Sequence, residues 1–140
     1  MTTALDTNVI VALWDRNSAV SIPAQTALDQ ALHRGGLVVS AVVFAELMAA
    51  PGRTEAFLNA FFKDTAIKVE FDLDEPVWRA AGRAFQAYAA RRRKQREPGP
   101  RRILADFLIG AHATQRGYQL LTLDESMYRT AFAGLSLITA

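Results

Sequence analysis

At 140 residues the chain is long enough for one hydrophobic core and too short for two, which predicts a single globular domain, residues 1–140. Its 51% apolar content and net charge of +2 are ordinary, and the absence of cysteine excludes disulfides, thiolate chemistry and cysteine-bound zinc. No apolar run is long enough to cross a membrane, and no signal-peptide pattern opens the sequence, so we expect a cytoplasmic protein.

Strand-like and helix-like segments alternate along the first half of the chain. A short β-prone run leads into Asp6, and the apolar residues after it suit a helix that begins near Thr7. Ser21 is the expected N-cap of the next helix, and Ser40 is the expected cap of the helix AVVFAELMAA. The predicted elements are, in order, strand Thr3–Leu5, helix 7–14, helix Ser21–Arg34, strand Leu37–Val39, helix 41–50, helix Arg53–Asp64 and strand Ile67–Phe71.

The second half continues this alternation around a basic segment. Asp74 is the expected cap of a long helix that runs into an arginine cluster and is broken by Pro98, Gly99 and Pro100. Pro100 is also well placed to start the helix that carries Asp106. The remaining predicted elements are a helix over 103–113, strand Gln119–Thr122, a short helix from Asp124 through Tyr128 and strand Leu135–Thr139.

The order of these elements predicts the fold class. Strands that alternate with helices at this spacing favour an α/β fold, in which a mainly parallel sheet of about five strands is covered on both faces. Right-handed crossovers join the strands of such a sheet. Ligands bind beyond the carboxyl ends of the strands, at the point where the strand order reverses.

Two acids, Asp106 and Glu46, are the only charged residues in otherwise apolar helical stretches. A buried carboxylate without a partner is costly, so an acid in this position usually pairs with a cation or binds a metal. For Asp106 the structural alternative is an ion pair with Arg102, one turn earlier. For Glu46 the alternative is a side chain that extends out of the core to solvent.

Two further acids, Asp6 and Asp124, follow the ends of predicted strands and belong at the carboxyl edge of the sheet. Each has a structural alternative as a helix N-cap. If the helical acids lean over this edge, the cluster needs a cation, because neighbouring like charges raise one another's pKa. Oxygen ligands without cysteine favour Mg²⁺ or Mn²⁺. The helix that starts at Thr7 would also present backbone N–H groups to a phosphate. This combination indicates metal-assisted hydrolysis of phosphodiester bonds.

A basic strip, residues 91–102, carries a net charge of +6, so the rest of the chain has a net charge of −4. Such a strip is a plausible binding surface for the phosphate backbone of RNA, and the alternative is a solvated loop. Its basic residues are Arg91, Arg92, Arg93, Lys94, Arg96, Arg101 and Arg102. The two histidines, His33 and His112, are interpreted as structural, because His112 lies about 120° around its helix from Asp106 by helical geometry.

Four segments together resemble the PIN-domain ribonucleases, most closely the toxins of VapBC-type toxin–antitoxin pairs. They are LDTNVIVALW at the start, FAEL around Glu46, ILADFLIGAHA around Asp106 and LLTLDESMY around Asp124. The resemblance covers nearly the whole chain and implies a three-layer α/β/α sandwich with endoribonuclease activity that depends on Mg²⁺ or Mn²⁺. It also implies a homodimer and a cognate antitoxin whose C-terminal segment lies across the active-site groove.

The resemblance assigns metal-site and catalytic roles to Asp6, Glu46, Asp106 and Asp124. Asn8 and Thr122 would orient the carboxylates or water from behind the metal ligands. One departure puts a second metal ion in doubt. Many relatives have another acid two residues after the position of Asp124, followed by an aromatic, whereas this chain has Ser126 and Met127. Glu125 is a possible substitute, although its side chain should point elsewhere.

Two other functions are open to this sequence. The first is a module that binds nucleic acid or a partner through the basic strip without turnover, and its binding would be salt-dependent and indifferent to metal. The second is a phosphotransfer or phosphatase domain, which also places acids at strand ends. That chemistry needs a lysine near the phosphate, and none of Lys63, Lys68 and Lys94 closely follows the end of a predicted strand.

Overall fold

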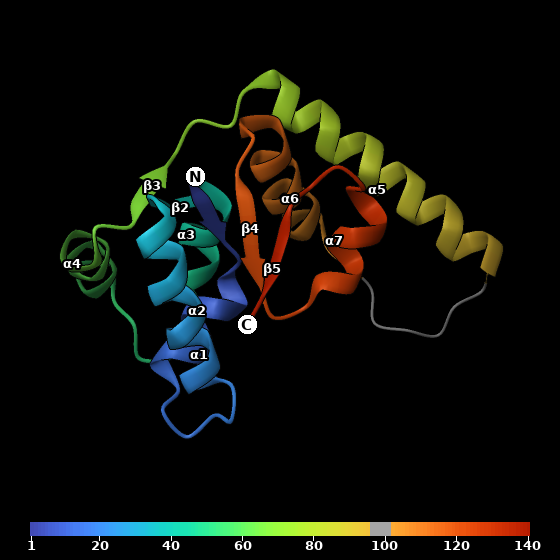
Figure 1. The fold of residues 1–140 in the computed structure, drawn as a ribbon. Helices are drawn as coiled ribbons and strands as arrows, with labels where there is room; N and C mark the ends of the chain where they lie inside the picture. The colour runs from blue at the N-terminus through green and yellow to red at the C-terminus, as the bar shows by residue number, and fades with distance from the viewer. Residues whose placement is uncertain (96–101) are drawn as a thin grey trace.

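The structure is a computed structural model that describes residues 1–95 and 102–140, and its centre is a five-stranded sheet (Figure 1). The strands are β1 (Thr3–Leu5), β2 (Leu37–Ser40), β3 (Lys68–Glu70), β4 (Gln119–Thr122) and β5 (Leu137–Thr139). Their order across the sheet is β3-β2-β1-β4-β5, and every neighbouring pair is parallel. The prediction of a mainly parallel sheet of about five strands is confirmed.

Seven helices in the described ranges cover the sheet. They are α1 (Thr7–Trp14), α2 (Ser21–Arg34), α3 (Ala41–Met48), α4 (Glu55–Thr65), α5 (Glu75–Gln95), α6 (Leu104–Arg116) and α7 (Glu125–Ala131). The chain steps from β1 toward one edge of the sheet and from β4 toward the other, so right-handed connections place α1–α4 and α5–α7 on opposite faces. Figure 1 shows the blue-to-green helices on one side and the yellow-to-red helices on the other. This is the expected α/β/α sandwich.

The core lies between the sheet and these two helix layers. Each of β1, β2 and β4 contributes at least three fully buried residues, as expected for parallel strands that are covered on both faces. Val9, Ile10, Val43 and Leu47 pack into the core from α1 and α3 with at most a trace of exposure. In the described part of the chain, no helix has both the length and the apolar character that a membrane span requires.

Side chains cap the starts of α1, α3, α4 and α5, whereas α2, α6 and α7 begin at residues whose side chains make no capping hydrogen bond. The Ser40 hydroxyl accepts a hydrogen bond from the Val43 N–H, and the Asp74 carboxylate accepts one from the Val77 N–H, as predicted. The prediction that Ser21 is an N-cap is wrong, because Ser21 is already helical. The N-cap position is occupied by Val20, whose side chain makes no capping hydrogen bond. The turn before α2 is instead held by a hydrogen bond from the Val20 N–H to the Ser18 hydroxyl.

β1, α1, α2 and β4 have the predicted boundaries, and most of the other elements differ from them by one to three residues. The third and last strands are shorter than predicted, and α4 begins two residues later, where Thr54 caps it. The predicted break at Pro98, Gly99 and Pro100 lies outside the described residues. The helix that carries Asp106 begins at Leu104.

A close contact between α6 and the end of α7 fixes the position of the helix that carries Asp106. A Cβ atom at Gly110 would lie 2.4 Å from the ring of Phe132, so only glycine fits here without a shift. Phe132 is the C-cap of α7, which is the helix that follows Asp124. The contact therefore holds Asp106 and Asp124, which are distant in sequence, on neighbouring walls of the same region.

Candidate active-site cleft

The strand order reverses between β1 and β4, and a cleft of about 350 Å³ opens at their carboxyl ends. Asp6 directly follows β1, and Asp124 follows β4 by two residues. Glu46 of α3 and Asp106 of α6 reach the same cleft from the helix layers. The residues that line it are Asp6, Thr7, Asn8, Val11, Glu46, Arg102, Asp106, Asp124, Met127 and Tyr128. The structure thus brings the four predicted acids to one place.

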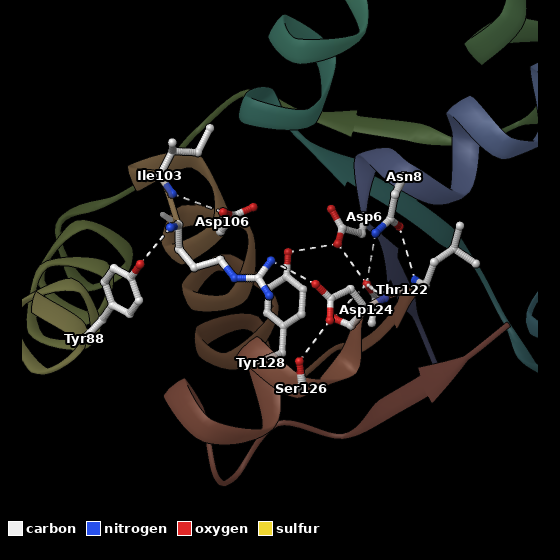
Figure 2. Close-up of polar contacts among 11 residues, drawn as sticks. Asp6, Asn8, Tyr88, Ile103, Asp106, Thr122, Asp124, Ser126 and Tyr128 are labelled. Carbon is white, nitrogen blue, oxygen red and sulfur yellow. Dashed lines mark hydrogen bonds and ion pairs between the residues drawn. The ribbon is translucent and has the colours of Figure 1, made fainter. Parts of the chain in front are cut away.

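Asp6 is the most deeply buried of these acids, with 7% of its surface exposed. Its Oδ1 accepts a hydrogen bond from the Thr7 N–H at 2.8 Å, and its Oδ2 accepts from the hydroxyls of Thr122 at 2.9 Å and Tyr128 at 3.0 Å (Figure 2). Burial raises the pKa of Asp6 to about 6, against the effect of these hydrogen bonds, and the nearby charge of Asp106 adds to the rise. Asp6 is therefore the N-cap of α1, and burial makes its ionised form less favourable than in water.

Asn8 and Thr122 support this carboxylate from behind. The Thr122 hydroxyl donates to Asp6 and accepts from the Asp124 N–H at 3.0 Å and the Asn8 amide nitrogen at 3.5 Å. The Asn8 amide oxygen accepts from the Leu123 N–H at 3.2 Å, which ties α1 to the turn after β4. These contacts are of the kind that the family resemblance implies for Asn8 and Thr122, namely hydrogen bonds that orient the acids.

Glu46 is held by a residue that the sequence analysis did not select. The Thr7 hydroxyl donates to Glu46 Oε1 at 2.6 Å, while the Thr7 N–H is occupied by Asp6. The first N–H of α1 is therefore not free for a phosphate, contrary to the prediction for this helix start. The half-buried Glu46 lines the cleft, so the alternative of a side chain that simply extends to solvent does not describe it.

Asp106 is half-buried and accepts a hydrogen bond from the Ile103 N–H at 3.2 Å, which closes the first turn of α6. The alternative of an ion pair with Arg102 is wrong. The Arg102 guanidinium instead pairs with Asp124 across the cleft, with 2.8 Å between Nη1 and Oδ2. The reason is geometric: Arg102 precedes the helix, so its side chain is not restricted to the helical spacing assumed for that pair.

Asp124 does not act as the predicted cap. It precedes α7 without a capping bond, and its Oδ1 accepts from the Ser126 hydroxyl at 3.0 Å while Oδ2 pairs with Arg102. Burial alone would raise the pKa of Asp124, but Arg102 and Ser126 hold it below its ordinary value. The short helix also continues beyond Tyr128 to Ala131.

Glu125 points away from the cleft, as anticipated. Its Oε2 accepts from the Thr139 hydroxyl at 2.7 Å and pairs with Arg129 at 2.7 Å. Ser126 donates to Asp124, and Met127 contributes an apolar wall to the cleft. No acid therefore stands where the family pattern has its additional one.

A family model identifies the protein family to which this chain belongs. The family model described as the PIN domain matches residues 3–133. The chain is a member of the PIN-domain family. A comparison with individually curated proteins gave no significant match.

Solved structures of low sequence identity share the fold of this PIN domain. The VapBC2 complex of Rickettsia felis, bound to a promoter DNA fragment, matches with a TM-score of 0.74 at 17% identity, over 100% of this chain and 99% of that one. VapBC-1 of nontypeable Haemophilus influenzae matches with 0.66 at 23% identity, over 99% and 98% of the two chains. The structure of FitAcB from Neisseria gonorrhoeae matches with a TM-score of 0.65 at 22% identity, over 97% of this chain and 96% of that one.

The donor chemistry of the cleft fits a small divalent cation. All four acids carry oxygen atoms that could bind a metal, and the raised pKa of Asp6 comes from burial first, with a smaller contribution from the charge of Asp106. Within residues 1–95 and 102–140, however, no three acidic or histidine side chains are arranged closely enough to hold an ion together. Mg²⁺ needs only one or two carboxylates because it retains several waters, so the residues fit this ion without a tight cage.

The basic strip of this PIN domain divides into parts with different surroundings. Arg93 and Lys94 are exposed at the end of α5, whereas Arg91 and Arg92 are half-buried and Arg92 donates to the Tyr88 hydroxyl. The predicted RNA-binding residues Arg96 and Arg101 lie outside the described residues. Arg102 lines the cleft and belongs to the site instead of the open strip.

The histidines take no part in the cleft. His112 is 1% exposed, and its Nε2 lies 2.9 Å from Glu70 Oε1, whereas His33 is exposed and hydrogen-bonded to the Asp29 carbonyl near the end of α2. None of the three lysines lines the cleft, so the site lacks the lysine that a phosphotransfer domain needs.

Sequence reasoning missed Tyr128 and Thr7, which hold Asp6 and Glu46 respectively. Tyr128 is 2% exposed, and burial followed by the charge of Asp6 raises its pKa, so its hydroxyl remains a hydrogen-bond donor. The available signal was its position in the LLTLDESMY motif, four residues after Asp124 and so one helical turn away.

Proposed function

We propose that this PIN domain is an Mg²⁺-dependent endoribonuclease and the toxin of a VapBC-type toxin–antitoxin pair. The observation that carries the proposal is the meeting of Asp6, Glu46, Asp106 and Asp124 at one cleft at the switch point of the sheet. PIN domains are nucleases that generally use divalent metal, and the fold matches chains from VapBC complexes. Mn²⁺ should substitute for Mg²⁺ because it accepts the same oxygen ligands.

The protein side chains have distinct tasks in this reaction. Asp6, Asp106, Glu46 and Asp124 would hold Mg²⁺, which supplies an activated water and offsets charge on the phosphoryl oxygens. Thr122 and Tyr128 fix the Asp6 carboxylate, and the Thr7 hydroxyl fixes Glu46. These neutral donors orient the acids without neutralising them, so the negative charge of the cleft is kept for a cation.

Cleavage of structured RNA by the purified protein tests the proposal. We expect cleavage with Mg²⁺ or Mn²⁺ and none with EDTA. Asp106→Asn retains an oxygen for the Ile103 N–H and should lower the rate about 100- to 1,000-fold, the typical loss when one group that stabilises charge is removed.

The matched control is Asp72→Asn, which changes an exposed acid outside the cleft and should leave the rate unchanged. Asp6→Asn should behave like Asp106→Asn. Cleavage at the wild-type rate by either cleft variant would remove the metal-site argument. Metal-independent RNA binding without any cleavage would favour the alternative of a binding module.

The exposed end of α5 is the proposed RNA-binding surface. Changing Arg91, Arg92 and Arg93 to Ala should weaken RNA binding, make it less sensitive to salt and leave Mg²⁺ affinity intact, because these residues do not line the cleft. Binding measured at two salt concentrations checks this expectation. An unchanged RNA affinity would mean that this part of the strip is a solvated helix end.

The C-terminal segment of the antitoxin is proposed to lie across the active-site cleft, as the family resemblance implies, and another part of the antitoxin is proposed to bind an apolar groove of about 710 Å³ between α1, α2 and α4. Ile22 and Leu32 are 76% and 51% exposed at this groove, which is unusual for isoleucine and leucine unless a partner covers them. The chain is also proposed to form a homodimer, which light scattering would test.

The product of a small gene adjacent to the coding sequence is the candidate antitoxin. Ile22→Glu should weaken its complex with this chain at least about tenfold, since burying a charge against an apolar segment is costly. Gln30→Glu introduces the same charge at an exposed position of α2 outside the groove and should have no effect. Equal affinities of the two variants would place the antitoxin elsewhere.

A further inference from the structure

Arg102 differs in its location from the other basic side chains of the described residues, because it lies in the active-site cleft. Among the described residues that line the cleft, it is the single basic side chain, and the other charged groups there are the four acids. Its Nη1 lies 2.8 Å from Asp124 Oδ2, and its side chain is 31% exposed. Its backbone N–H donates to the Tyr88 hydroxyl at 2.8 Å, so α5 anchors the residue while the side chain spans to the acid (Figure 2).

This ion pair conflicts with a metal-binding role for Asp124. Both carboxylate oxygens of Asp124 are already engaged, Oδ2 by Arg102 and Oδ1 by the Ser126 hydroxyl. A guanidinium and a divalent cation repel each other when they share one carboxylate, and the repulsion is large in a partly enclosed site. Release of Arg102 from Asp124 would remove this repulsion when Asp124 binds a cation.

The released guanidinium has one suitable partner in the same place. An RNA phosphate that enters this cleft meets Asp6, Glu46, Asp106 and Asp124, all of which repel it. A planar guanidinium can donate two parallel hydrogen bonds to phosphate oxygens, which an ammonium cannot do. Because Tyr88 holds the backbone and not the side chain, the guanidinium can change partner without moving α6.

We propose that Arg102 is the phosphate-binding residue of the cleft, paired with Asp124 in the metal-free protein and transferred to an RNA phosphate when a divalent cation binds. This inference rests on the proposed function, and it removes Arg102 from the basic strip, whose other described residues do not line the cleft. It also predicts that RNA and metal bind cooperatively. The metal offsets the negative charge that repels the phosphate, and the phosphate binds the guanidinium that would repel the metal.

Two measurements on Arg102→Gln test the transfer. Binding of Mg²⁺ alone is measured by titration calorimetry. Binding of a labelled single-stranded RNA is measured by fluorescence anisotropy in EDTA and in Ca²⁺, which takes the same oxygen ligands. Arg83→Gln is the matched control, because Arg83 is an exposed arginine of α5 outside the cleft.

Arg102→Gln should weaken RNA binding in Ca²⁺ at least about tenfold, the effect of losing one charge-assisted contact, and should change it little in EDTA. Its Mg²⁺ affinity should equal or exceed that of the wild type, because Asp124 is no longer paired. Arg102→Lys should recover only part of the RNA affinity, since a lysine ammonium cannot donate two parallel hydrogen bonds to a phosphate. Arg83→Gln should match the wild type throughout.

Two results would overturn the inference. If Arg102→Gln binds RNA in Ca²⁺ as well as Arg83→Gln does, Arg102 does not contact the phosphate. If its Mg²⁺ affinity falls together with its RNA affinity, Arg102 only supports Asp124. Failure of the proposed function has a different signature, in which the wild-type protein itself binds neither Mg²⁺ nor RNA in a metal-dependent way.

Discussion

Two acids that the chain holds by several hydrogen bonds, the half-buried Glu70 and the buried Asp6, lie in contrasting surroundings. Glu70, at the end of β3, accepts from His112 and from the Tyr118 hydroxyl, each at 2.9 Å, and Arg116 lies 3.6 Å away. Burial alone would raise the pKa of Glu70, but these donors hold it below its ordinary value. Asp6 also accepts several hydrogen bonds, yet its pKa rises to about 6.

The difference lies first in burial, because Asp6 is buried and Glu70 is half-buried, and then in the charge of the neighbours. Arg116 and, when protonated, His112 supply positive charge to Glu70, whereas Asp6 receives hydrogen bonds only from neutral groups and faces Asp106. An acid whose charge is compensated within the chain stabilises the fold. An acid that is oriented but not compensated stabilises the protein only when a cation arrives, which is the property expected of a metal ligand. Hydrogen bonding alone does not distinguish these two kinds of acid, because both accept several hydrogen bonds.

The largest expected effect is the pH dependence of stability that Asp6 imposes. Because its pKa rises from the ordinary 3.8 to about 6, the folded protein binds a proton more tightly than the unfolded chain does, and stability falls as pH rises between these values. The shift corresponds to a loss of about 3 kcal/mol. Urea unfolding in EDTA at a series of pH values should show this fall in the wild type and not in Asp6→Asn. An identical pH profile for the two proteins would contradict the assigned pKa.

The second effect concerns the compensated acid. Glu70→Ala should lower the free energy of unfolding by about 2–3 kcal/mol, because it leaves the buried His112 and the half-buried Tyr118 without their partner. Glu75→Ala, which breaks the exposed pair with Arg79, should cost at most about 0.5 kcal/mol. Metal affinity measured on Glu70→Ala should equal that of the wild type. A loss of metal binding would show that the two sites are not separate.

The third effect is stabilisation by metal. Mg²⁺ at ten times its dissociation constant should stabilise the wild type by about 1.4 kcal/mol, since it binds the folded state and offsets the repulsion between Asp6 and Asp106. Calorimetric melting with and without Mg²⁺ measures the shift. Asp106→Asn should lose most of it, and Glu70→Ala should keep it. A melting temperature that Mg²⁺ does not change in the wild type would argue against the metal site.

The smallest effect tests the neutral donors. Tyr128→Phe removes the hydroxyl that donates to Asp6 and should cost about 1 kcal/mol at neutral pH, the net value of one hydrogen bond. Because that bond favours the charged form, its loss should raise the pKa of Asp6 further and move the pH profile toward higher pH. A profile that shifts toward lower pH would mean that Tyr128 does not stabilise the carboxylate.

The sequence was sufficient to predict the order of strands and helices and the place of Asp6 and Asp124. Parallel strands end at a common edge, so a residue just after a strand has a known location once the sheet is recognised. Glu46 and Asp106 were predictable because a lone charge in an apolar helix must find a partner.

Side-chain partners across long separations were not predictable in this way. Tyr128 and Asp6 are 122 positions apart, and no periodicity relates them. The local rule that paired Arg102 with Asp106 also failed, because Arg102 precedes α6 and can reach Asp124. The Ser21 cap failed because the turn before α2 begins at Ser18.

The place of β4 beside β1 has a consequence for protein synthesis. β1 leaves the ribosome before its neighbour β4, which consists of residues 119–122, and the donor Tyr128 follows still later. A growing chain that has released Asp6 and Glu46 therefore has no completed cleft. For the ribonuclease that we propose, the capacity to cut RNA arises only after Tyr128 has been made, so the segments between β1 and β4 are translated before the enzyme becomes active.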